Sequence, residues 1–188
     1  IQCWGSGNWG KLGNGSTSNQ STPVSVSNID NATAISAADS HTCAVLSGGT
    51  VKCWGYGSSG RMGNGSTSNQ TTPVSVSNIS TATAVSAGSA HTCVLLSAGT
   101  VKCWGEGFRS QLGNGSISQQ NTPVSVSNIS TATAVTTHEY HTCALLSGGT
   151  VKCWGEGGAG RLGNGNTSDN QDTPVSVSNI STATAISA

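Results

Sequence analysis

The sequence repeats one phrase at a fixed interval, and this periodicity limits what the chain can fold into. A Cys-Trp-Gly triplet begins at Cys3, Cys53, Cys103 and Cys153, and Gly-Asn-Gly follows it at Gly13, Gly63, Gly113 and Gly163. Repeats of about 50 residues are typical of solenoids and propellers, in which each unit buries its apolar face against a neighbour. We therefore interpret residues 1–188 as one array, with units 1–50, 51–100, 101–150 and an incomplete unit 151–188.

The array begins and ends inside a repeat. Thr-Pro-Val occurs in all four units, whereas His-Thr-Cys occurs only at His41, His91 and His141. The fourth unit lacks the segment that corresponds to residues 138–150 of the third unit, which is a strand and a turn. We expect protein outside residues 1–188, either neighbouring subunits or a longer polypeptide, to complete the array.

Each unit shows the pattern of four short strands. Residues 41–46 and 51–54 flank Ser-Gly-Gly-Thr, which predicts a hairpin because glycine adopts positive φ without steric cost. Residues 73–76 predict a third strand that begins at a proline, and residues 83–86 predict a fourth. The expected fold is all-β, with propeller-type blades of four antiparallel strands that form an open array or part of a larger assembly.

Composition excludes several classes of function. Only 7% of the residues are charged and the formal net charge is zero, so the basic stripe of a nucleic-acid-binding protein is not expected. No apolar run approaches the roughly 18 residues that span a bilayer, and no helical periodicity of useful length occurs. We therefore expect neither nucleic-acid binding nor a membrane span, and the start without Met or signal peptide suggests a mature or excised segment.

Several motifs together resemble a known repeat. The run Cys-Trp-Gly-x-Gly-x-x-Gly-x-Leu-Gly-Asn-Gly, then Thr-Pro-Val, then His-Thr-Cys-Ala-Leu-Leu-Ser-Gly-Gly-Thr-Val, resembles the regulator of chromosome condensation repeat over essentially the whole chain. The resemblance implies four-stranded antiparallel blades around an axis, often seven to a ring. Kelch repeats share the length and the double glycine, but here Trp54 follows Gly49 too closely and the intervening tyrosine is absent.

The resemblance leaves the function open. Members of this family perform nucleotide exchange on a small GTPase, light sensing through tryptophan clusters, inhibition of β-lactamases, or scaffolding, so fold alone does not define function. This chain has cysteines where the family usually has other small or apolar residues, and it lacks the charged loops expected of an exchange factor. Its five tryptophans are four repeat residues plus Trp9 rather than a light-sensing cluster.

Two cysteine pairings respect the repeat. One joins Cys43–Cys53, Cys93–Cys103 and Cys143–Cys153 and leaves Cys3; the other joins Cys3–Cys43, Cys53–Cys93 and Cys103–Cys143 and leaves Cys153. We favour the first, because both cysteines of a hairpin lie at similar distances from the glycine turn. Cys3 would then pair with a cysteine outside this chain. Disulfides at this density predict an extracellular or cell-surface location.

The cysteines and histidines also allow other roles. Buried free thiols are one alternative, and a zinc site of His41, Cys43 and Cys53 is another. The nine residues between the two cysteines do not match the spacing of structural zinc sites, so we expect no metal and no cofactor. His41, His91 and His141 share one repeat position and are interpreted as hydrogen-bonded blade residues. With no nucleophile elbow and no repeated pair of acids, we do not expect an enzyme.

The repeats differ mainly in short loops, where binding residues are expected. The variable windows are residues 56–59 with their counterparts, residues 38–40 with theirs, and the polar stretch after Gly-Asn-Gly. We take Phe108, Arg109, His138, Glu139 and Tyr140 as candidate binding-loop residues; neutral variation in solvated loops is the alternative.

Sequons for N-linked glycans recur with the repeat. Asn14, Asn64 and Asn114 each begin Asn-Gly-Ser, and several further asparagines begin Asn-x-Ser or Asn-x-Thr. If the source has the glycosylation machinery, these asparagines are candidate glycan acceptors in a secreted protein.

These patterns predict a non-enzymatic extracellular repeat protein that binds other proteins. Its first predicted role is structural, with chains that assemble with copies of themselves into an oligomer or filament, since head-to-tail contacts that do not close a ring propagate. The alternative is a surface adhesin or protein-binding scaffold, and a weaker one is a protein inhibitor or exchange factor.

Overall fold

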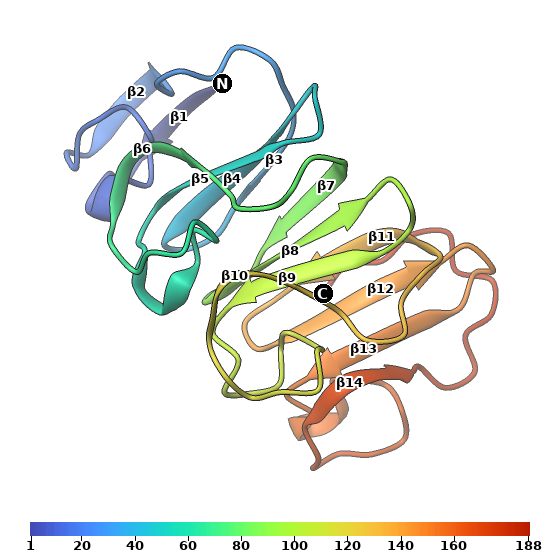
Figure 1. Cartoon of the computed structure of the whole chain (residues 1–188). Helices are drawn as coiled ribbons and strands as arrows, with labels where there is room; N and C mark the ends of the chain where they lie inside the picture. Colours follow the sequence, from blue (N-terminus) through green and yellow to red (C-terminus); the bar gives the residue numbers. More distant parts are fainter.

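A computed structural model describes residues 1–188 as three four-stranded antiparallel sheets and one two-stranded sheet (Figure 1). Blade I contains β1 (Gln2–Gly5) and β2 (Gln20–Ser25). Blade II contains β3 (Ala32–Ala37), β4 (His41–Leu46), β5 (Val51–Gly55) and β6 (Gln70–Ser75). Blade III contains β7 (Ala82–Ala87), β8 (His91–Leu96), β9 (Val101–Gly105) and β10 (Gln120–Ser125). Blade IV contains β11 (Ala132–Thr137), β12 (His141–Leu146), β13 (Val151–Gly155) and β14 (Gln171–Ser176).

The four strands expected in each repeat are present in the three complete units, but each four-stranded sheet begins with the strand that the sequence placed last. β3 pairs with β4 through a short turn in which Ala38 N–H donates to His41 O at 2.9 Å. The connection that follows β6 instead passes to the next sheet. A blade therefore runs from residue 32 to residue 75, across the boundary between two Cys-Trp-Gly units.

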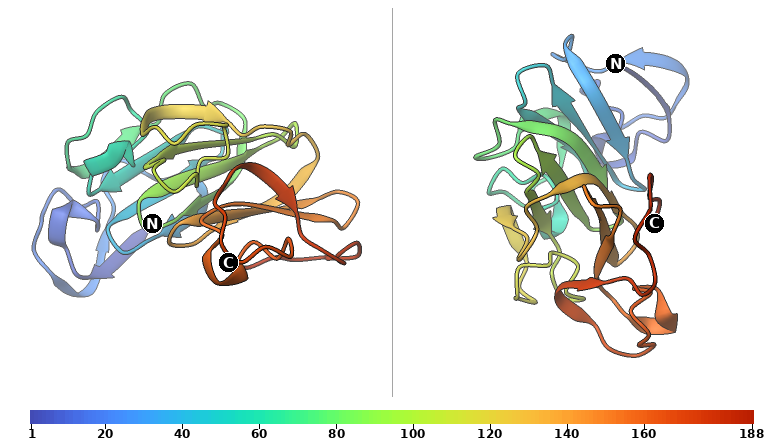
Figure 2. Two further views of the ribbon diagram at one scale, coloured as in Figure 1. Left: turned by 90° about the horizontal axis from the view of Figure 1, so that it is seen from below. Right: turned by 90° about the vertical axis from the view of Figure 1, so that its right-hand side faces the viewer.

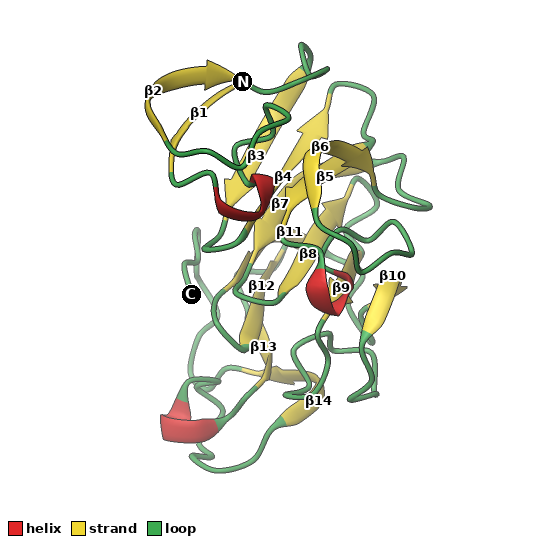
Figure 3. Cartoon of the chain, turned by 90° about the vertical axis from the view of Figure 1, so that its left-hand side faces the viewer, coloured by secondary structure: helices red, strands yellow, loops and turns green.

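The sheets stand in a row in chain order, and the row does not close on itself (Figures 1 and 2). The last residues lie beside β11, where Ala188 N–H donates to Thr136 Oγ1 at 3.2 Å. Three short 3-10 turns, Asn8–Gly10, Ser58–Gly60 and Gly158–Gly160, lie in the long loops after β1, β5 and β13 (Figure 3). None of the helical segments has the length and apolar character needed to cross a membrane.

One disulfide joins the second and third strands of each complete blade. The bonds are Cys43–Cys53, Cys93–Cys103 and Cys143–Cys153, with Cα atoms 4.1 Å apart in each. Each pair stands directly opposite across the antiparallel ladder, as the glycine turn dictates; Gly49, for example, has a φ of 75°. Cys3 is the free cysteine. Because Cys43 and Cys53 are bonded to each other, they do not form a zinc site with His41.

The apolar core lies between blades rather than within one sheet. One buried cluster joins Val45 and Met62 of blade II to Val94 and Trp104 of blade III. A second cluster joins blade III to blade IV in the same way, through Leu112 and Trp154. A single sheet cannot bury both of its faces, so the blades depend on one another for their cores.

The repeated tryptophans lock each blade to the preceding one. Trp54, Trp104 and Trp154 are fully buried. Their indole N–H groups donate to the carbonyl oxygens of Lys11, Arg61 and Gln111 at 3.0, 2.8 and 3.0 Å. The ring of Trp104 lies so close to Gly63 that a Cβ there would come within 2.7 Å of Nε1. Glycine is therefore required at this position by contact as well as by its positive φ of 66°.

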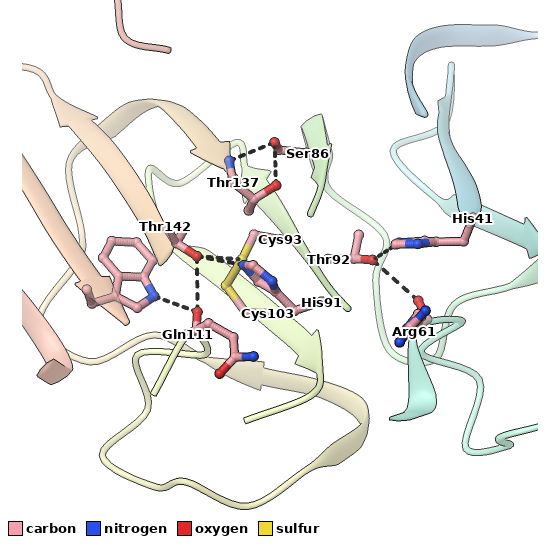
Figure 4. Close-up of a disulfide and its surroundings, with 11 residues drawn as sticks. His41, Arg61, Ser86, His91, Thr92, Cys93, Cys103, Gln111, Thr137 and Thr142 are labelled. Atoms are coloured by element: carbon pink, nitrogen blue, oxygen red, sulfur yellow. Dashed lines mark hydrogen bonds between the residues drawn. A yellow bond between two sulfur atoms is a disulfide. The ribbon is translucent and has the colours of Figure 1, made fainter. Parts of the chain in front are cut away.

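Threonine and histidine side chains form further hydrogen bonds between neighbouring blades (Figure 4). The hydroxyl of Thr92 donates to the same Arg61 oxygen at 3.3 Å, and Thr142 donates to Gln111 O at 3.0 Å. His41 Nε2 lies 2.8 Å from Thr92 Oγ1, and His91 Nε2 lies 2.9 Å from Thr142 Oγ1. Since each hydroxyl has given its proton to a carbonyl, the imidazole Nε2–H must be the donor to threonine.

This arrangement favours neutral histidine. The Nδ1 atoms of His41 and His91 are buried without a hydrogen-bond partner, so a second ring proton would be an unpaired buried donor. Burial lowers the pKa of His41 to about 3, and the Arg61 charge adds to this effect. Burial also lowers the pKa of His91 to about 3, with contributions from the neighbouring histidines and Arg61.

Removing one repeated tryptophan should separate two blades. We expect Trp104→Ala to reduce the free energy of unfolding by about 3–5 kcal/mol, as for other buried large aromatics, in a urea titration followed by circular dichroism. Trp4→Ala is the matched control, because Trp4 holds the same repeat position but is 64% exposed. Equal losses from the two substitutions would contradict the lock.

Stability should fall in mild acid. The pKa of His41 and His91 is lowered in the fold, so the unfolded chain binds more protons below about pH 6.5, and stability is lost as the pH falls from there toward 3. We expect each histidine to contribute about 1.4 kcal/mol per pH unit to this loss, measured as the urea midpoint between pH 7 and pH 5. His91→Gln should reduce the slope, whereas His138→Gln, at an exposed residue, should retain it.

Candidate protein-binding face

Loops from all four blades emerge at one end of the sheets. In each complete blade the start of the second strand stands opposite the end of the third, as His41 does opposite Gly55. The loops attached at these points are joined by backbone bonds of 2.9 Å, such as that from Tyr56 N–H to Ser40 O. We call this end the loop face; it consists of residues 6–11, 38–40, 56–61, 88–90, 106–111, 138–140 and 156–161.

Every aromatic residue outside the Cys-Trp-Gly triplets lies on the loop face. These residues are Trp9, Tyr56, Phe108 and Tyr140. Phe108 is 63% exposed and Trp9 is 45% exposed. Tryptophan, tyrosine and arginine are enriched in the central residues of protein interfaces, which gives this distribution a functional meaning.

Blades III and IV together form one aromatic and charged cluster. The Arg109 guanidinium lies over the Tyr140 ring, 4.5 Å from its centroid. Glu156 forms ion pairs with both Arg109 and Arg161. The Glu156 side chain is 17% exposed and that of Arg109 is 47% exposed, so the carboxylate anchors an arginine that solvent still reaches. Stacking and ion pairing thus hold the Arg109 guanidinium in a fixed position.

Blades I and II form a second cluster of the same kind. The rings of Trp9 and Tyr56 lie 4.9 Å apart, and the Arg61 guanidinium lies 4.8 Å from the Tyr56 ring centroid. Arg61 also donates to Ser40 Oγ at 2.9 Å. Burial lowers the pKa of Arg61, and Tyr56 and Glu106 partly offset this effect. Tyr56 thus contacts the indole of Trp9 from the loop of blade I and the guanidinium of Arg61 from its own loop.

The structure places the five predicted binding-loop residues on this face but joins only Arg109 and Tyr140 directly. His138 and Glu139 are exposed beside them, and the His138 ring lies 5.9 Å from the ring of His141. Burial lowers the pKa of His141, with smaller contributions from the charges of His138 and Arg161.

Sequence reasoning missed several residues of the loop face. Trp9, Tyr56, Arg61, Glu156 and Arg161 were not singled out, although each occupies a repeat position that varies between units. A count of the aromatic residues outside the repeated triplets would have found Trp9 and Tyr56. The contacts across blades needed the structure, because they join residues about 47 positions apart, as in the Arg109–Glu156 pair.

The side chains of the loop face offer aromatic surfaces and charge-assisted hydrogen bonds, and the face carries four basic and four acidic residues. The basic residues are Lys11, Arg61, Arg109 and Arg161; the acidic ones are Asp39, Glu106, Glu139 and Glu156. No group of three or more His, Cys, Asp or Glu side chains lies close enough to hold a metal ion.

The sequon asparagines lie in turns of the long loops. The Oδ1 atoms of Asn14, Asn64 and Asn114 accept backbone N–H bonds from the residues two positions later, at 3.1, 3.0 and 3.2 Å. Such Asx turns fix the start of each polar stretch after Gly-Asn-Gly. Glycan attachment at these asparagines stays a prediction.

Stacked four-stranded blades with a tryptophan repeated at each interface between blades define a propeller-type repeat protein. The model of the regulator of chromosome condensation (RCC1) repeat matches residues 3–45, 48–95 and 98–145, and a second RCC1 repeat model matches residues 32–61, 82–111 and 139–161. The chain belongs to the RCC1 repeat family. No curated protein matches it in sequence.

Solved structures, that of yeast RCC1 among them, share this fold. Yeast RCC1 (Prp20), in a complex with Kap60, is similar with a TM-score of 0.80 and 18% identity over 95% of this chain and 44% of that one. Human WBSCR16 gives a TM-score of 0.78 and 18% identity over 90% of this chain and 45% of that one. The chain therefore spans less than half the length of these structures.

The ion pairs of Glu156 should contribute little to stability. We expect Glu156→Gln to reduce the free energy of unfolding by about 1 kcal/mol or less, because Arg109 and Arg161 remain partly solvated. Glu139→Gln, at an exposed acid on the same face, is the control for loss of one charge. A loss well above that of the control, measured by urea titration, would show that the cluster holds the blades together.

Proposed function

We propose that this chain is part of an extracellular protein-binding scaffold whose loop face contacts the partner protein. The observation that supports this most strongly is the gathering of Trp9, Tyr56, Phe108 and Tyr140 on one end of the array. Two of the three variable windows of the repeat lie on this face, and aromatic residues of this kind are enriched in the energetically important centres of protein interfaces.

The scaffold beneath these loops is rigid. Each complete blade is cross-linked by a disulfide next to the loop face, and the blades are joined by the tryptophan and threonine bonds. Loops held on a rigid framework lose little conformational entropy on binding. Arg109, already stacked and ion-paired, is prepared for contact in this way.

The three disulfides favour an oxidising location, outside the cell or on its surface. The Prp20p protein of Saccharomyces cerevisiae, similar at 18% identity, has been described for its binding to Gsp1p and histones. The loop face of this chain has balanced charge, so its partner is expected to present a mixed polar and apolar surface. We infer a binding role without catalysis.

Affinity capture with loop-face variants tests this function. The wild-type chain, immobilised, should retain a partner from the extracellular fluid of its source, and Phe108→Ser with Tyr140→Ser should reduce the amount retained at least tenfold, because central aromatic residues each contribute more than about 1 kcal/mol. The matched control is Ile180→Ser, which removes an exposed apolar side chain at the opposite end of blade IV. Equal capture by all three proteins would refute the assignment of the loop face.

Self-assembly is the second candidate, and one observation favours it. Trp4 is exposed, and at the other end of the array Gly163 has no tryptophan against it. A hollow of about 310 Å³ lies there, lined by Leu162, Val177 and Ile186 among others. We infer that Trp4 of one copy takes the place beside Gly163 of another, as Trp154 lies beside Gly113, once the Val177 side chain that now lies against Gly163 has moved aside. Light scattering over a concentration series should then show growth that Trp4→Ser abolishes.

A further inference from the structure

The dipeptide Asn-Gly lies at each interface between blades. The three sites are Asn14-Gly15, Asn64-Gly65 and Asn114-Gly115. Each follows the glycine that lies against the tryptophan of the next blade, as Gly63 lies against Trp104. Gly65 has a φ of 87° and is exposed, and Gly15 and Gly115 share both properties. The fold thus places a chemically labile sequence at the point where successive blades are joined.

Asparagine before glycine reacts without an enzyme. The glycine amide nitrogen loses its proton to hydroxide and attacks Cγ of the asparagine, so that an N–Cγ bond forms, the Cγ–Nδ2 bond breaks, and Nδ2 leaves as ammonia with a proton from water. Water then adds to one of the two carbonyl carbons of the cyclic imide and breaks its bond to nitrogen, which gives aspartate or isoaspartate. Glycine leaves the attacking nitrogen unshielded, because it has no side chain.

In the fold, the next blade holds the attacking nitrogen. Gly65 N–H donates to Asn121 O of blade III at 2.9 Å. The corresponding bonds, also of 2.9 Å, run from Gly15 N–H to Thr71 O and from Gly115 N–H to Asp172 O. An amide proton that is donated to a carbonyl oxygen reaches hydroxide only when the hydrogen bond opens. Each site is therefore protected by the blade that follows it.

A second hydrogen bond holds the asparagine side chain. Oδ1 of Asn64 accepts from Ser66 N–H at 3.0 Å and closes an Asx turn around Gly65. Both partners of this bond belong to one loop, so separation of the blades does not break it directly. The bond from Gly65 to Asn121 is the one that separation removes.

We propose that Asn14, Asn64 and Asn114 are modification sites, which convert to aspartate or isoaspartate when the following blade separates. Isoaspartate carries the main chain through Cβ and adds one atom to the backbone between Gly63 and Gly65. Gly65 N–H is then displaced from Asn121 O, and both products add a negative charge. A transient opening of the interface becomes a lasting one. The sites are independent of what the loop face binds.

Peptide mapping of the 188-residue chain measures the conversion at each site separately. The chain is made in a host that attaches no N-linked glycans and is incubated in mildly alkaline buffer. The reference is a synthetic peptide of residues 60–70, which contains Asn64 without the blades. We expect Asn64 to convert at least about tenfold more slowly in the folded chain, because the reaction follows the fraction of time in which the protecting bond is open. Equal rates would overturn the proposal.

Two matched variants test whether the protection belongs to one interface. Trp104→Phe removes the bond to Arg61 O between blades II and III, and Trp154→Phe removes the bond to Gln111 O between blades III and IV. Loss of one such hydrogen bond should accelerate conversion by about fivefold at the adjacent site. We expect Trp104→Phe to act on Asn64 and not on Asn114, and Trp154→Phe to do the reverse. Equal acceleration of both sites, or of neither, would contradict the proposal.

A measurement on the unaltered chain does not depend on how the variants fold. Amide hydrogen exchange, followed by nuclear magnetic resonance, reports how often the Gly15, Gly65 and Gly115 bonds to the next blade open. We expect slow exchange at all three glycines, and the order of their exchange rates should match the order of conversion at the preceding asparagines. Immediate exchange at these glycines, or a different order, would show that the inter-blade bonds do not control the reaction.

Discussion

One backbone oxygen in each loop holds successive blades together. The carbonyl of Arg61 accepts hydrogen bonds from both Trp104 and Thr92 of the following blade, and Lys11 and Gln111 play the same part at their interfaces. A carbonyl has two lone pairs, and two buried donors satisfy both. Because the oxygen belongs to the backbone, the side chain at that position can vary freely as Lys, Arg or Gln. The lock is thus compatible with a variable surface directly above it.

This arrangement connects the core of the array to its loop face. In blade II, Arg61 supplies the carbonyl oxygen and also places its side chain on the loop face. In blade III, Gln111 supplies the carbonyl oxygen, and Arg109 of the same loop lies on the loop face. The tryptophan lock therefore fixes the height and angle of each loop relative to the next. Contacts such as Arg109 on Tyr140 cross between blades and depend on that placement. Residues in neighbouring loops form one continuous surface because the hydrogen bonds between blades hold those loops in fixed positions relative to each other.

Much of the fold could be predicted from the sequence, because comparison of the repeats shows which positions form strands and turns and which vary. The glycine turn between Cys43 and Cys53 and the strand patterns on both sides predicted the hairpin that the structure contains. Trp54, Trp104 and Trp154 share one position of the repeated triplet and are buried, whereas Trp4 at the same position is exposed. The sequence does not show this difference, because burial at that position needs the loop of a preceding blade. The hydrogen bond between His41 and Thr92 joins residues 51 positions apart, and local sequence patterns do not predict such a contact.

Three indole N–H groups donate to backbone oxygens between blades, whereas those of Trp4 and Trp9 do not, and the joining of the blades depends on this difference. Hydrogen exchange of the five indole protons, followed by nuclear magnetic resonance in deuterated buffer, measures this directly. Trp54, Trp104 and Trp154 donate to buried carbonyl oxygens and should exchange slowly, whereas Trp4 and Trp9, at 64% and 45% exposure, should exchange at once. If Trp104 exchanged as fast as Trp4, the blades would not be joined in this way, and the loop face would have no fixed geometry.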